Sequence, residues 1–199
     1  TGFIRDPEDL AEVTAFFKRR LPRFQENKLA FGELIHLYDA LVGFYFYTQD
    51  FTKGYRYAQK WVNLFDTHPE MVKSEPEFYI RALNCLLVAQ NKLGYYQEFS
   101  QTHRKLVALK RQKRLTLNRN INLTLLKAIY VHEINRHFML GEFRSGTRIV
   151  GKLEDDINRF IPLLDHNSVL ILYYKIACLY FGSDQYKRAL HWLNRIINA

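Results

Sequence analysis

Residues 140–146, LGEFRSG, have a counterpart in residues 93–99, LGYYQEF. Each stretch places a Leu-Gly pair ahead of an aromatic residue, and two related stretches, TQDFTKG at 48–54 and SDQYKRA at 183–189, share the later part of the pattern. Glycine commonly ends a helix in the left-handed conformation, so that a new helix can begin after it. The four stretches therefore predict four corners between helices.

The corners recur at a regular interval. Aligned on Phe51, Tyr96, Phe143 and Tyr186, they lie 45, 47 and 43 residues apart. Four positions relative to each corner aromatic carry apolar or small residues. Thirteen residues before it stand Tyr38, Leu83, Tyr130 and Tyr173, and nine before it Val42, Leu87, Ile134 and Ala177. Three residues after it stand Gly54, Phe99, Gly146 and Ala189, and ten after it Trp61, Leu106, Leu153 and Ile196. Such spacings lie on one face of a helix. Each unit is therefore predicted to be a hairpin of two helices.

The corners also carry residues that suit helix ends. Gly94 and Gly141 fit the left-handed residue that closes a helix. At the other two corners, Asp50 and either Ser183 or Asp184 are candidates for the cap of the following helix.

The aromatic residue of each corner is expected to fold back onto the preceding helix. Small residues stand three positions after it in three units, at Gly54, Gly146 and Ala189. A glycine inside a helix costs about 1 kcal/mol relative to alanine, so its repeated use predicts a close approach of the two helices.

This pattern resembles the tetratricopeptide repeat. The fourth unit matches with Tyr173, Ile176, Ala177, Tyr180, Tyr186, Ala189, Leu193 and Ile196, and the first with Tyr38, Leu41, Tyr45, QDF, Gly54, Ala58 and Trp61. The resemblance covers about residues 28–199, although the usual period is about 34 residues, so longer helices and links are expected here. It implies an all-α fold, a right-handed superhelical solenoid of antiparallel helix hairpins.

We expect a single α-solenoid domain over residues 1–199, because no segment has the composition of a flexible linker. Asp6 as a cap and Pro7 in the first turn predict a leading helix at 6–24. The helical hairpins are predicted at 28–68, 74–115, 118–161 and 165–199.

The last helix, residues 184–198, is apolar beyond one narrow stripe. Terminal repeats normally carry a polar outer face. We therefore expect either that the chain is a fragment of a longer one with further repeats, or that it associates with another chain through this C-terminal helix.

The resemblance implies a concave groove, lined by the first helices of the hairpins, that binds a protein or peptide partner. The residues it places there are His36, Asp39, Gly43, Phe46, Arg81, Asn84, Val88, Asn91, Asn135, Phe138, Tyr174 and Phe181. Asparagine can pair with both groups of a peptide backbone, and aromatic residues form pockets for side chains. For any single one of them, packing or solvation is the competing explanation. The favoured function is a non-catalytic interaction or peptide-sensing scaffold.

Charge offers an alternative. The net charge is +9, and no acidic residue stands between Glu98 and Glu133. The basic residues of this region are Arg104, Lys105, Lys110, Arg111, Lys113, Arg114, Arg119 and Lys127. They would suit the phosphates of a nucleic acid or an acidic partner protein. They also alternate with apolar residues at helical spacing, which the solvated face of an amphipathic helix explains equally well.

Residues 132–137, HEINRH, resemble a zinc-binding motif but have the wrong spacing. Five residues turn a helix by roughly 140° beyond a full turn, so the two histidines cannot share a metal as they do at a spacing of four. A buried polar pair of Glu133 with His137 is favoured over a catalytic pair, and His103 is interpreted in the same way. No catalytic, metal or cofactor residue is therefore predicted, and the protein is not expected to be an enzyme. A metal hydrolase built on His132 and Glu133 is kept as a rival hypothesis.

Cys85 and Cys178 stand far apart within apolar stretches and are interpreted as inert core residues. The longest apolar run, residues 169–181, contains Lys175 and is shorter than the roughly 18 residues of a membrane span. We expect no membrane contact and a cytoplasmic location.

Overall fold

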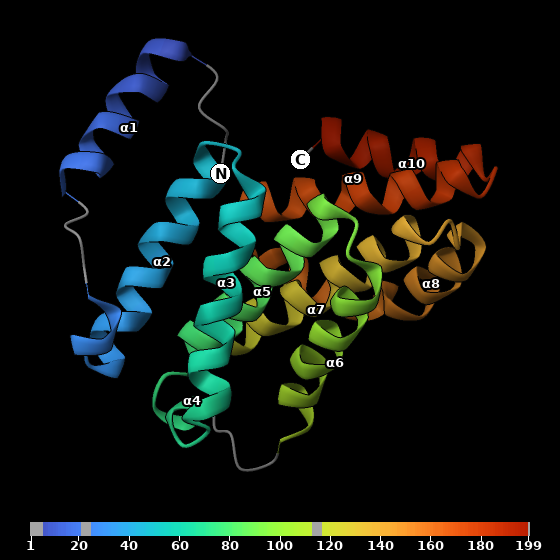
Figure 1. The fold of residues 1–199 in the computed structure, drawn as a ribbon. Helices are drawn as coiled ribbons and strands as arrows, with labels where there is room; N and C mark the ends of the chain where they lie inside the picture. The colour runs from blue at the N-terminus through green and yellow to red at the C-terminus, as the bar shows by residue number, and fades with distance from the viewer. Residues whose placement is uncertain (1–5, 21–24, 113–116, 199) are drawn as a thin grey trace. The chain divides into compact units, whose positions relative to one another are not determined.

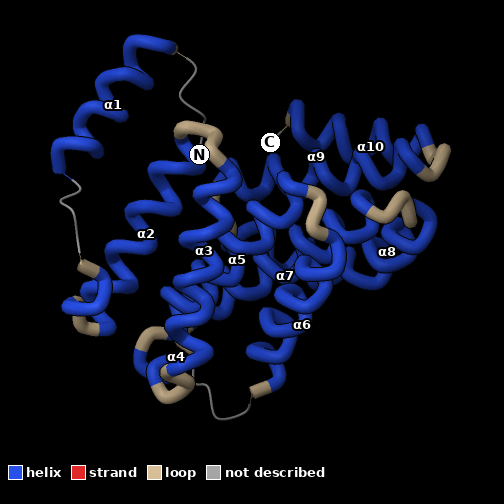
Figure 2. Tube along the Cα trace, viewed as in Figure 1, coloured by secondary structure: helices blue, strands red, loops and turns tan. Residues whose placement is uncertain are grey.

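The structure, a computed structural model, describes residues 6–20, 25–112 and 117–198. All regular structure in these residues is helical (Figure 1; Figure 2). The α-helices are α1 (Pro7–Arg20), α2 (Phe31–Tyr47), α3 (Phe51–Thr67), α4 (Met71–Ser74), α5 (Pro76–Leu93), α6 (Tyr96–Arg111), α7 (Arg119–Met139), α8 (Phe143–Phe160), α9 (His166–Gly182) and α10 (Tyr186–Ile197). Two short 3₁₀ turns cover Glu26–Lys28 and Ile161–Leu163. The prediction of an all-α chain is confirmed.

The chain divides into two compact units at the corner between Tyr95 and Tyr96. Within residues 1–95, α2 packs on α3, α3 on α5, and α4 on α5. Within residues 96–199, α6 packs on α7, α7 on α8 and α9, α8 on α9, and α9 on α10. From α2 onward, the long helices that follow one another are therefore neighbours within each unit, which is compatible with a helical repeat. The single solenoid domain stays a prediction.

Most helix boundaries agree with the sequence pattern. The four predicted hairpins correspond in sequence to α2 with α3, α5 with α6, α7 with α8, and α9 with α10. The leading helix was predicted to reach residue 24, whereas α1 ends at Arg20 and residues 21–24 lie outside the described part of the chain. The segment between α3 and α5 also holds a short helix, α4.

All four corners share one backbone geometry. The residue two positions before each corner aromatic has a positive φ: 59° at Gln49, 73° at Gly94, 68° at Gly141 and 62° at Asp184. The N–H that follows it donates in every case to the carbonyl five residues earlier at 2.9 Å, as from Asp50 to Tyr45. This arrangement is the Schellman motif, which satisfies carbonyls at the end of a helix. The left-handed role expected of the two glycines is confirmed, and the repeat extends to the backbone.

Of the two side-chain caps predicted for the helices that follow the corners, the one on α3 is confirmed and the one on α10 is not. Asp50 Oδ1 accepts a hydrogen bond from the Lys53 N–H at 3.0 Å and caps α3. The prediction that Ser183 or Asp184 caps α10 is wrong, because Gln185 holds that position without a side-chain cap bond. Asp184 instead supplies the left-handed residue that ends α9.

Aromatic rings close the corners as predicted in three hairpins. The ring centroids are 5.8 Å apart for Phe46 and Phe51, 5.4 Å for Phe138 and Phe143, and 5.5 Å for Phe181 and Tyr186. In each pair the corner aromatic lies against the last turn of the preceding helix.

Close helix approach at the small residues is also confirmed. A Cβ built on Gly54 would lie 2.6 Å from the Phe46 ring. A Cβ on Gly146 would lie 2.9 Å from Leu179 and 3.0 Å from the Cβ of His137. Because real Cβ atoms do not approach other atoms so closely, glycine is required at both positions for the helices to pack as they do.

The periodic apolar positions form the core. The residues thirteen and nine positions before each corner aromatic are buried in all four hairpins, from Tyr38 and Val42 to Tyr173 and Ala177. Ten positions after it, Trp61 and Leu106 are fully buried, Ile196 is half-buried, and the side chain of Leu153 is not among those described. Each large apolar side chain buried in this way contributes about 1.5–3 kcal/mol.

Candidate functional site

An aromatic surface follows the first helices of residues 96–199. On α7 and α9, which pack together, Phe138, Tyr174 and Phe181 expose 50%, 60% and 66% of their surface. Ile171, one turn before Tyr174, is 46% exposed and extends the row along α9. We call Phe138, Tyr174 and Phe181 the aromatic wall, and Ile171 adjoins it. Sequence reasoning missed Ile171, although it stands at the register of His36 and Arg81.

Polar contacts join the same two helices beside the aromatic wall. Lys175 Nζ donates to Asn135 Oδ1 at 2.6 Å, and Lys127 Nζ donates to the Ser168 hydroxyl at 3.0 Å. Asn135 is buried. Its amide oxygen therefore helps to hold α9 against α7, which is a structural role in addition to the ligand-binding role proposed from sequence.

In residues 1–95 the equivalent face carries a charged pair. Arg81 Nε on α5 lies 3.0 Å from Asp39 Oδ1 on α2. Burial raises the pKa of Asp39, while the charges of Arg81 and His36 lower it. The ring of His36 meets Phe78 edge-on, with centroids 5.0 Å apart. Three of the predicted groove residues, His36, Asp39 and Arg81, thus lie on one face of α2 and α5.

The other predicted groove residues of this unit are half-buried: Gly43, Phe46, Asn84, Val88 and Asn91. Phe46 packs against Phe51 and over Gly54 and therefore stabilises the corner. A ligand-binding role for these residues stays a prediction.

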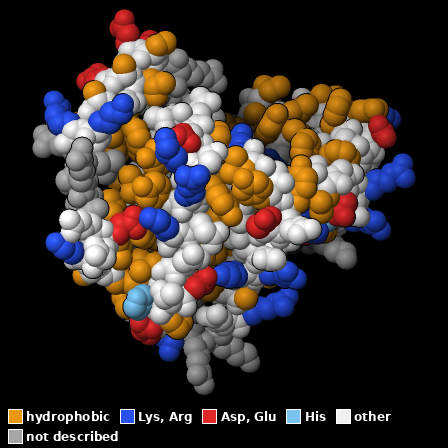
Figure 3. All heavy atoms as spheres, viewed as in Figure 1, with side chains coloured by type: hydrophobic (Ala, Val, Ile, Leu, Met, Phe, Trp, Pro, Cys, Tyr) orange, Lys and Arg blue, Asp and Glu red, His pale blue; other side chains and the backbone are white. Residues whose placement is uncertain are grey.

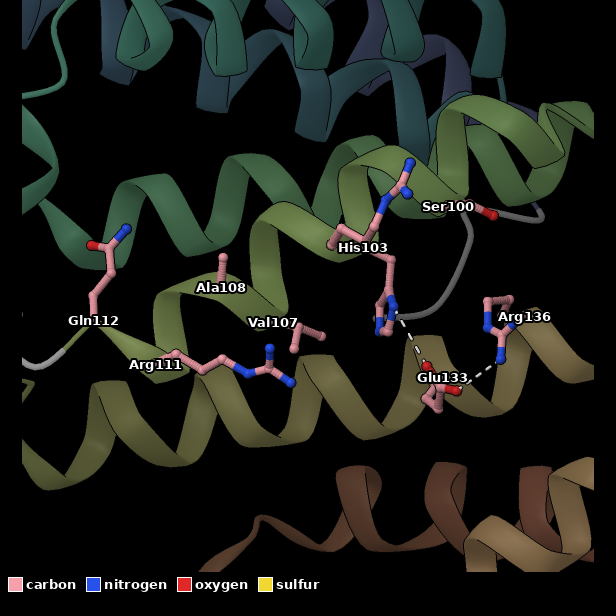
Figure 4. A pocket seen from close by; sticks show the side chains of 9 residues that line it. Ser100, His103, Val107, Ala108, Arg111, Gln112, Glu133 and Arg136 are labelled. Carbon is pink, nitrogen blue, oxygen red and sulfur yellow. Dashed lines mark hydrogen bonds and ion pairs between the residues drawn. The ribbon is translucent and has the colours of Figure 1, made fainter.

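A hollow of about 690 Å³ lies between α6 and α7. Its lining combines small, basic and acidic side chains: Ser100, His103, Arg104, Val107, Ala108, Arg111, Gln112, Glu133 and Arg136. The residues from Ser100 to Arg111 stand on α6, Gln112 follows its end, and Glu133 and Arg136 stand on α7. Figure 4 shows Arg111 reaching into the space between the two helices. The sequence pattern identified Arg104 and Arg111 as basic candidates but neither Arg136 nor the hollow itself.

Glu133 is the central charge of the hollow. Its carboxylate lies 3.5 Å from His103 Nδ1 and 3.0 Å from Arg136 (Figure 4). It also lies 3.3 Å from His137 Nε2. Nε2 of His103 also lies 3.3 Å from the Ile129 carbonyl oxygen. Burial lowers the pKa of His103, and the nearby Glu133 carboxylate partly offsets this effect. The predicted contact of Glu133 with His137 is confirmed, and His103 and His137 are buried, whereas Glu133 itself is half-buried.

The basic region is only partly available to a ligand. Arg104, Lys105, Lys110 and Arg111 are exposed on α6, and Arg119 is exposed at the start of α7. Among the described residues, neither Arg104 nor Arg111 forms an ion pair. Lys113 and Arg114 lie outside the described residues.

Two other lysines of this region contact their own fold. The Lys110 ammonium lies 5.9 Å from the centre of the Tyr130 ring. Lys127 bonds Ser168 and lies 3.9 Å from Asp165. Of the exposed basic residues of this region, Arg104 and Arg111 line the hollow.

His132 and Glu133 point into different surroundings. His132 is 1% exposed and meets the Phe99 ring at 5.8 Å, and burial lowers its pKa to about 3. Glu133 faces His103 and His137 instead. In the described part of the chain, no three His, Cys, Asp or Glu side chains are arranged to hold a metal ion.

Cys85 and Cys178 form no disulfide and are half-buried. Burial raises the pKa of the Cys85 thiol to about 12, which keeps it protonated and unreactive near neutral pH. The interpretation of Cys85 as an inert core residue agrees with this.

Across the described residues, no helix combines the length and the apolar character that crossing a membrane would need. Comparisons with protein-family models, with curated proteins and with solved structures return no match. The fold and its surfaces are therefore the basis for any assignment of function.

Proposed function

We propose that this protein is a non-catalytic, tetratricopeptide-like interaction module that holds a segment of a partner protein against the first helices of its hairpins. The observation that carries the proposal is the exposure of Phe138, Tyr174 and Phe181 on neighbouring helices. Burying one such ring is worth roughly 1.5–3 kcal/mol, so a partner that covers the aromatic wall gains affinity from it. Aromatic residues are also enriched among the side chains that dominate binding energy.

The common corner geometry supports a regular stack. The four corners repeat one backbone motif, and a solenoid built from such repeats has a continuous concave surface. The polar contacts between α7 and α9 would then fix the backbone that presents the aromatic side chains. A right-handed superhelix with a peptide groove is the arrangement that we propose on this basis.

Site-specific photo-crosslinking tests the proposal. We expect a benzophenone amino acid at Phe181 to capture one defined partner segment in cells, whereas the same group at Tyr47, an exposed aromatic outside the aromatic wall, captures none. The double substitution Tyr174→Ser/Phe181→Ser should reduce recovery of that partner at least tenfold. Equal capture at both positions, or recovery that the double substitution leaves unchanged, would contradict the proposal.

A second candidate function is supported by the hollow between α6 and α7. Arg104 and Arg111 line it from the same helix and form no ion pair with another described residue, so an acidic or phosphate-bearing partner could neutralise them. If nucleic acid binds here, affinity for a labelled single strand should fall steeply with salt. Arg104→Gln/Arg111→Gln should weaken binding and flatten the salt dependence, whereas Arg148→Gln on α8 should not. Weak binding that is unaffected by salt and by Arg104→Gln/Arg111→Gln would exclude this candidate.

A further inference from the structure

The hollow between α6 and α7 continues along α6 into a second one. The second hollow has a volume of about 410 Å³ and is lined by Tyr96, Gln97, Ser100, Gln101, Arg104 and Leu140. Ser100 and Arg104 line both hollows, so the two adjoin. We call the two hollows together the α6 groove. Between Tyr96 and Arg111 the helix beside this groove rises by about 22 Å, a length that suits an extended chain rather than a compact molecule.

One side of α6 faces the groove. It carries a stripe of five residues: Tyr96, Ser100, Arg104, Val107 and Arg111. Each residue advances about 100° around a helix, so the whole stripe spans about 80°. Glu98, the one carboxylate of α6, lies about 150° from the centre of the stripe and therefore points away from the groove. Figure 3 shows basic side chains gathered over α6.

Two arginines carry the unbalanced charge of the groove. Arg104 and Arg111 are exposed, and neither forms an ion pair with another described residue. Arg136, which lines the same hollow, lies 3.0 Å from Glu133, so these two charges balance. Glu133 is the one carboxylate among the described residues that line the groove. An occupant with two negative charges would therefore complement the groove.

The two arginines stand two turns apart on α6. Their seven-residue separation corresponds to a rise of about 10.5 Å along the helix. Successive residues of an extended chain rise by about 3.3 Å, so residues three positions apart are separated by about 10 Å. Two acidic residues at that spacing therefore match Arg104 and Arg111. Figure 4 shows Val107 and Ala108 between His103 and Arg111 along α6, so the residues between the two acids meet aliphatic side chains.

The lining of the groove favours a peptide over a nucleic acid. Proteins that hold single strands stack successive bases on aromatic rings. The hollow that contains both arginines has no Phe, Tyr or Trp among its described lining residues. Glu133 also lines this hollow and would repel a continuous row of phosphates. A peptide can place one acidic side chain at each arginine and neutral residues between them.

An apolar contact is available beyond Arg104. Tyr96 and Leu140 are 48% and 44% exposed and line the second hollow. Tyr96 stands eight residues before Arg104, a distance of about 12 Å along α6. An extended chain covers this distance in three to four residues. The same bound segment can therefore place an apolar side chain on Tyr96 and Leu140.

We propose that the α6 groove binds an extended peptide segment of a partner protein, with two acidic residues three positions apart and an apolar residue three or four positions beyond one of them. The acidic residues pair with Arg104 and Arg111, and the apolar residue packs on Tyr96 and Leu140. This peptide site rests on the second candidate function, because it names the partner that the hollow takes. It shares no residue with the aromatic wall.

Fluorescence anisotropy with labelled peptides tests the site. The probes are Leu-Thr-Thr-Glu-Val-Thr-Glu and the same residues in reverse order, since either chain direction fits the spacing. Each probe has an isomer with adjacent glutamates, as in Leu-Thr-Thr-Glu-Glu-Val-Thr, and a version with glutamine in place of glutamate. We expect one probe to bind the protein at low salt. Its isomer should bind at least threefold more weakly and its glutamine version at least tenfold more weakly.

Substitutions on the protein locate the bound peptide. Arg104→Gln/Arg111→Gln should weaken the probe at least tenfold with circular dichroism unchanged, because both side chains are exposed. Ala108→Glu adds a carboxylate between the two arginines at an exposed position and should have a similar effect. The matched control Arg148→Gln/Arg159→Gln removes the same charge from exposed positions of α8 and should change binding by less than twofold. Equal weakening by the control would overturn the proposal, because net charge alone would then explain the binding.

The remaining outcomes separate the peptide site from the proposed functions. Tyr174→Ser/Phe181→Ser should leave probe binding within twofold, so loss of the aromatic wall is distinguishable from loss of this site. A labelled oligothymidylate is the nucleic-acid probe. If it binds and Arg104→Gln/Arg111→Gln weakens it while neither peptide probe binds, the second candidate function holds for nucleic acid and the peptide site is overturned. Equal binding of a probe and its isomer would overturn the proposed spacing, and no binding of any of these anions would overturn the second candidate function as well.

Discussion

Gln49 and Asp184 adopt the same left-handed backbone conformation, with φ of 59° and 62°, at the position that glycine occupies in the other two corners. For residues with a Cβ this conformation costs roughly 1–2 kcal/mol. The corner is retained because the Schellman hydrogen bonds and the packed aromatic residue stabilise it. Two of the four hairpins therefore carry backbone strain that the other two avoid.

Gln49→Gly should relieve this strain. We expect it to raise the free energy of unfolding by about 1 kcal/mol, because glycine accepts a positive φ without steric cost. Gln49→Ala keeps a Cβ and should change stability by less than about 0.5 kcal/mol. Urea denaturation followed by circular dichroism compares the two, and equal stabilities would show that the corner is not strained.

Two glycines of α8 should respond to alanine in opposite directions. Gly146→Ala is expected to cost about 1–3 kcal/mol, since its Cβ would press on Leu179 and on the Cβ of His137. Gly151→Ala, with nothing within 4 Å of its Cβ, should instead gain up to about 1 kcal/mol from helix propensity. The difference in urea midpoint at constant slope measures both effects. Stabilisation by both changes would contradict the close approach at Gly146.

Burial of His132 predicts a stability that falls in acid. Its pKa is about 3 in the folded protein and near 6.5 when unfolded, so the unfolded chain binds one more proton between these values. Its contribution is complete above about pH 6.5 and is lost progressively as the pH falls toward 3. Between about pH 7 and pH 5 the loss amounts to about 2 kcal/mol.

His132→Leu should remove this dependence. We expect the variant to lose less stability than the wild type between about pH 7 and pH 5, as measured by urea denaturation at each pH. His166→Gln changes an exposed side chain at the start of α9 and should leave the dependence as it is. An unchanged pH dependence in His132→Leu would mean that this histidine is not buried as a neutral group.

The pair of Arg81 with Asp39 should stabilise residues 1–95 only slightly. Arg81 is 56% exposed on its side chain and Asp39 24% exposed, so water and salt screen the attraction. A double-mutant cycle with Asp39→Asn and Arg81→Gln should give a coupling of about 0.3–1 kcal/mol that falls in about 0.5 M salt. Coupling that persists unchanged in high salt would argue against an exposed ion pair.

Local patterns were sufficient to predict the helices and the corners between them. The offsets from Phe51, Tyr96, Phe143 and Tyr186 located the corners, the buried faces and the two left-handed glycines, because helix periodicity and chain termination depend on neighbouring residues. The left-handed residues Gln49 and Asp184 had no such signal. Their conformation follows from the packing of helices on both sides of the corner, which overrides the preference of the individual residue.

The sequence by itself determined that the chain forms helices, where the four corners lie and which helix faces are apolar. Only the tertiary structure decided which apolar faces are covered: Val62 and Val150 are buried by a following helix, whereas Ile197 and Leu193 at the matching positions are exposed. It also decided that a hollow lies between α6 and α7. The physical reason is that helix formation is governed by residues within a turn or two, whereas burial depends on a neighbour that is distant in sequence.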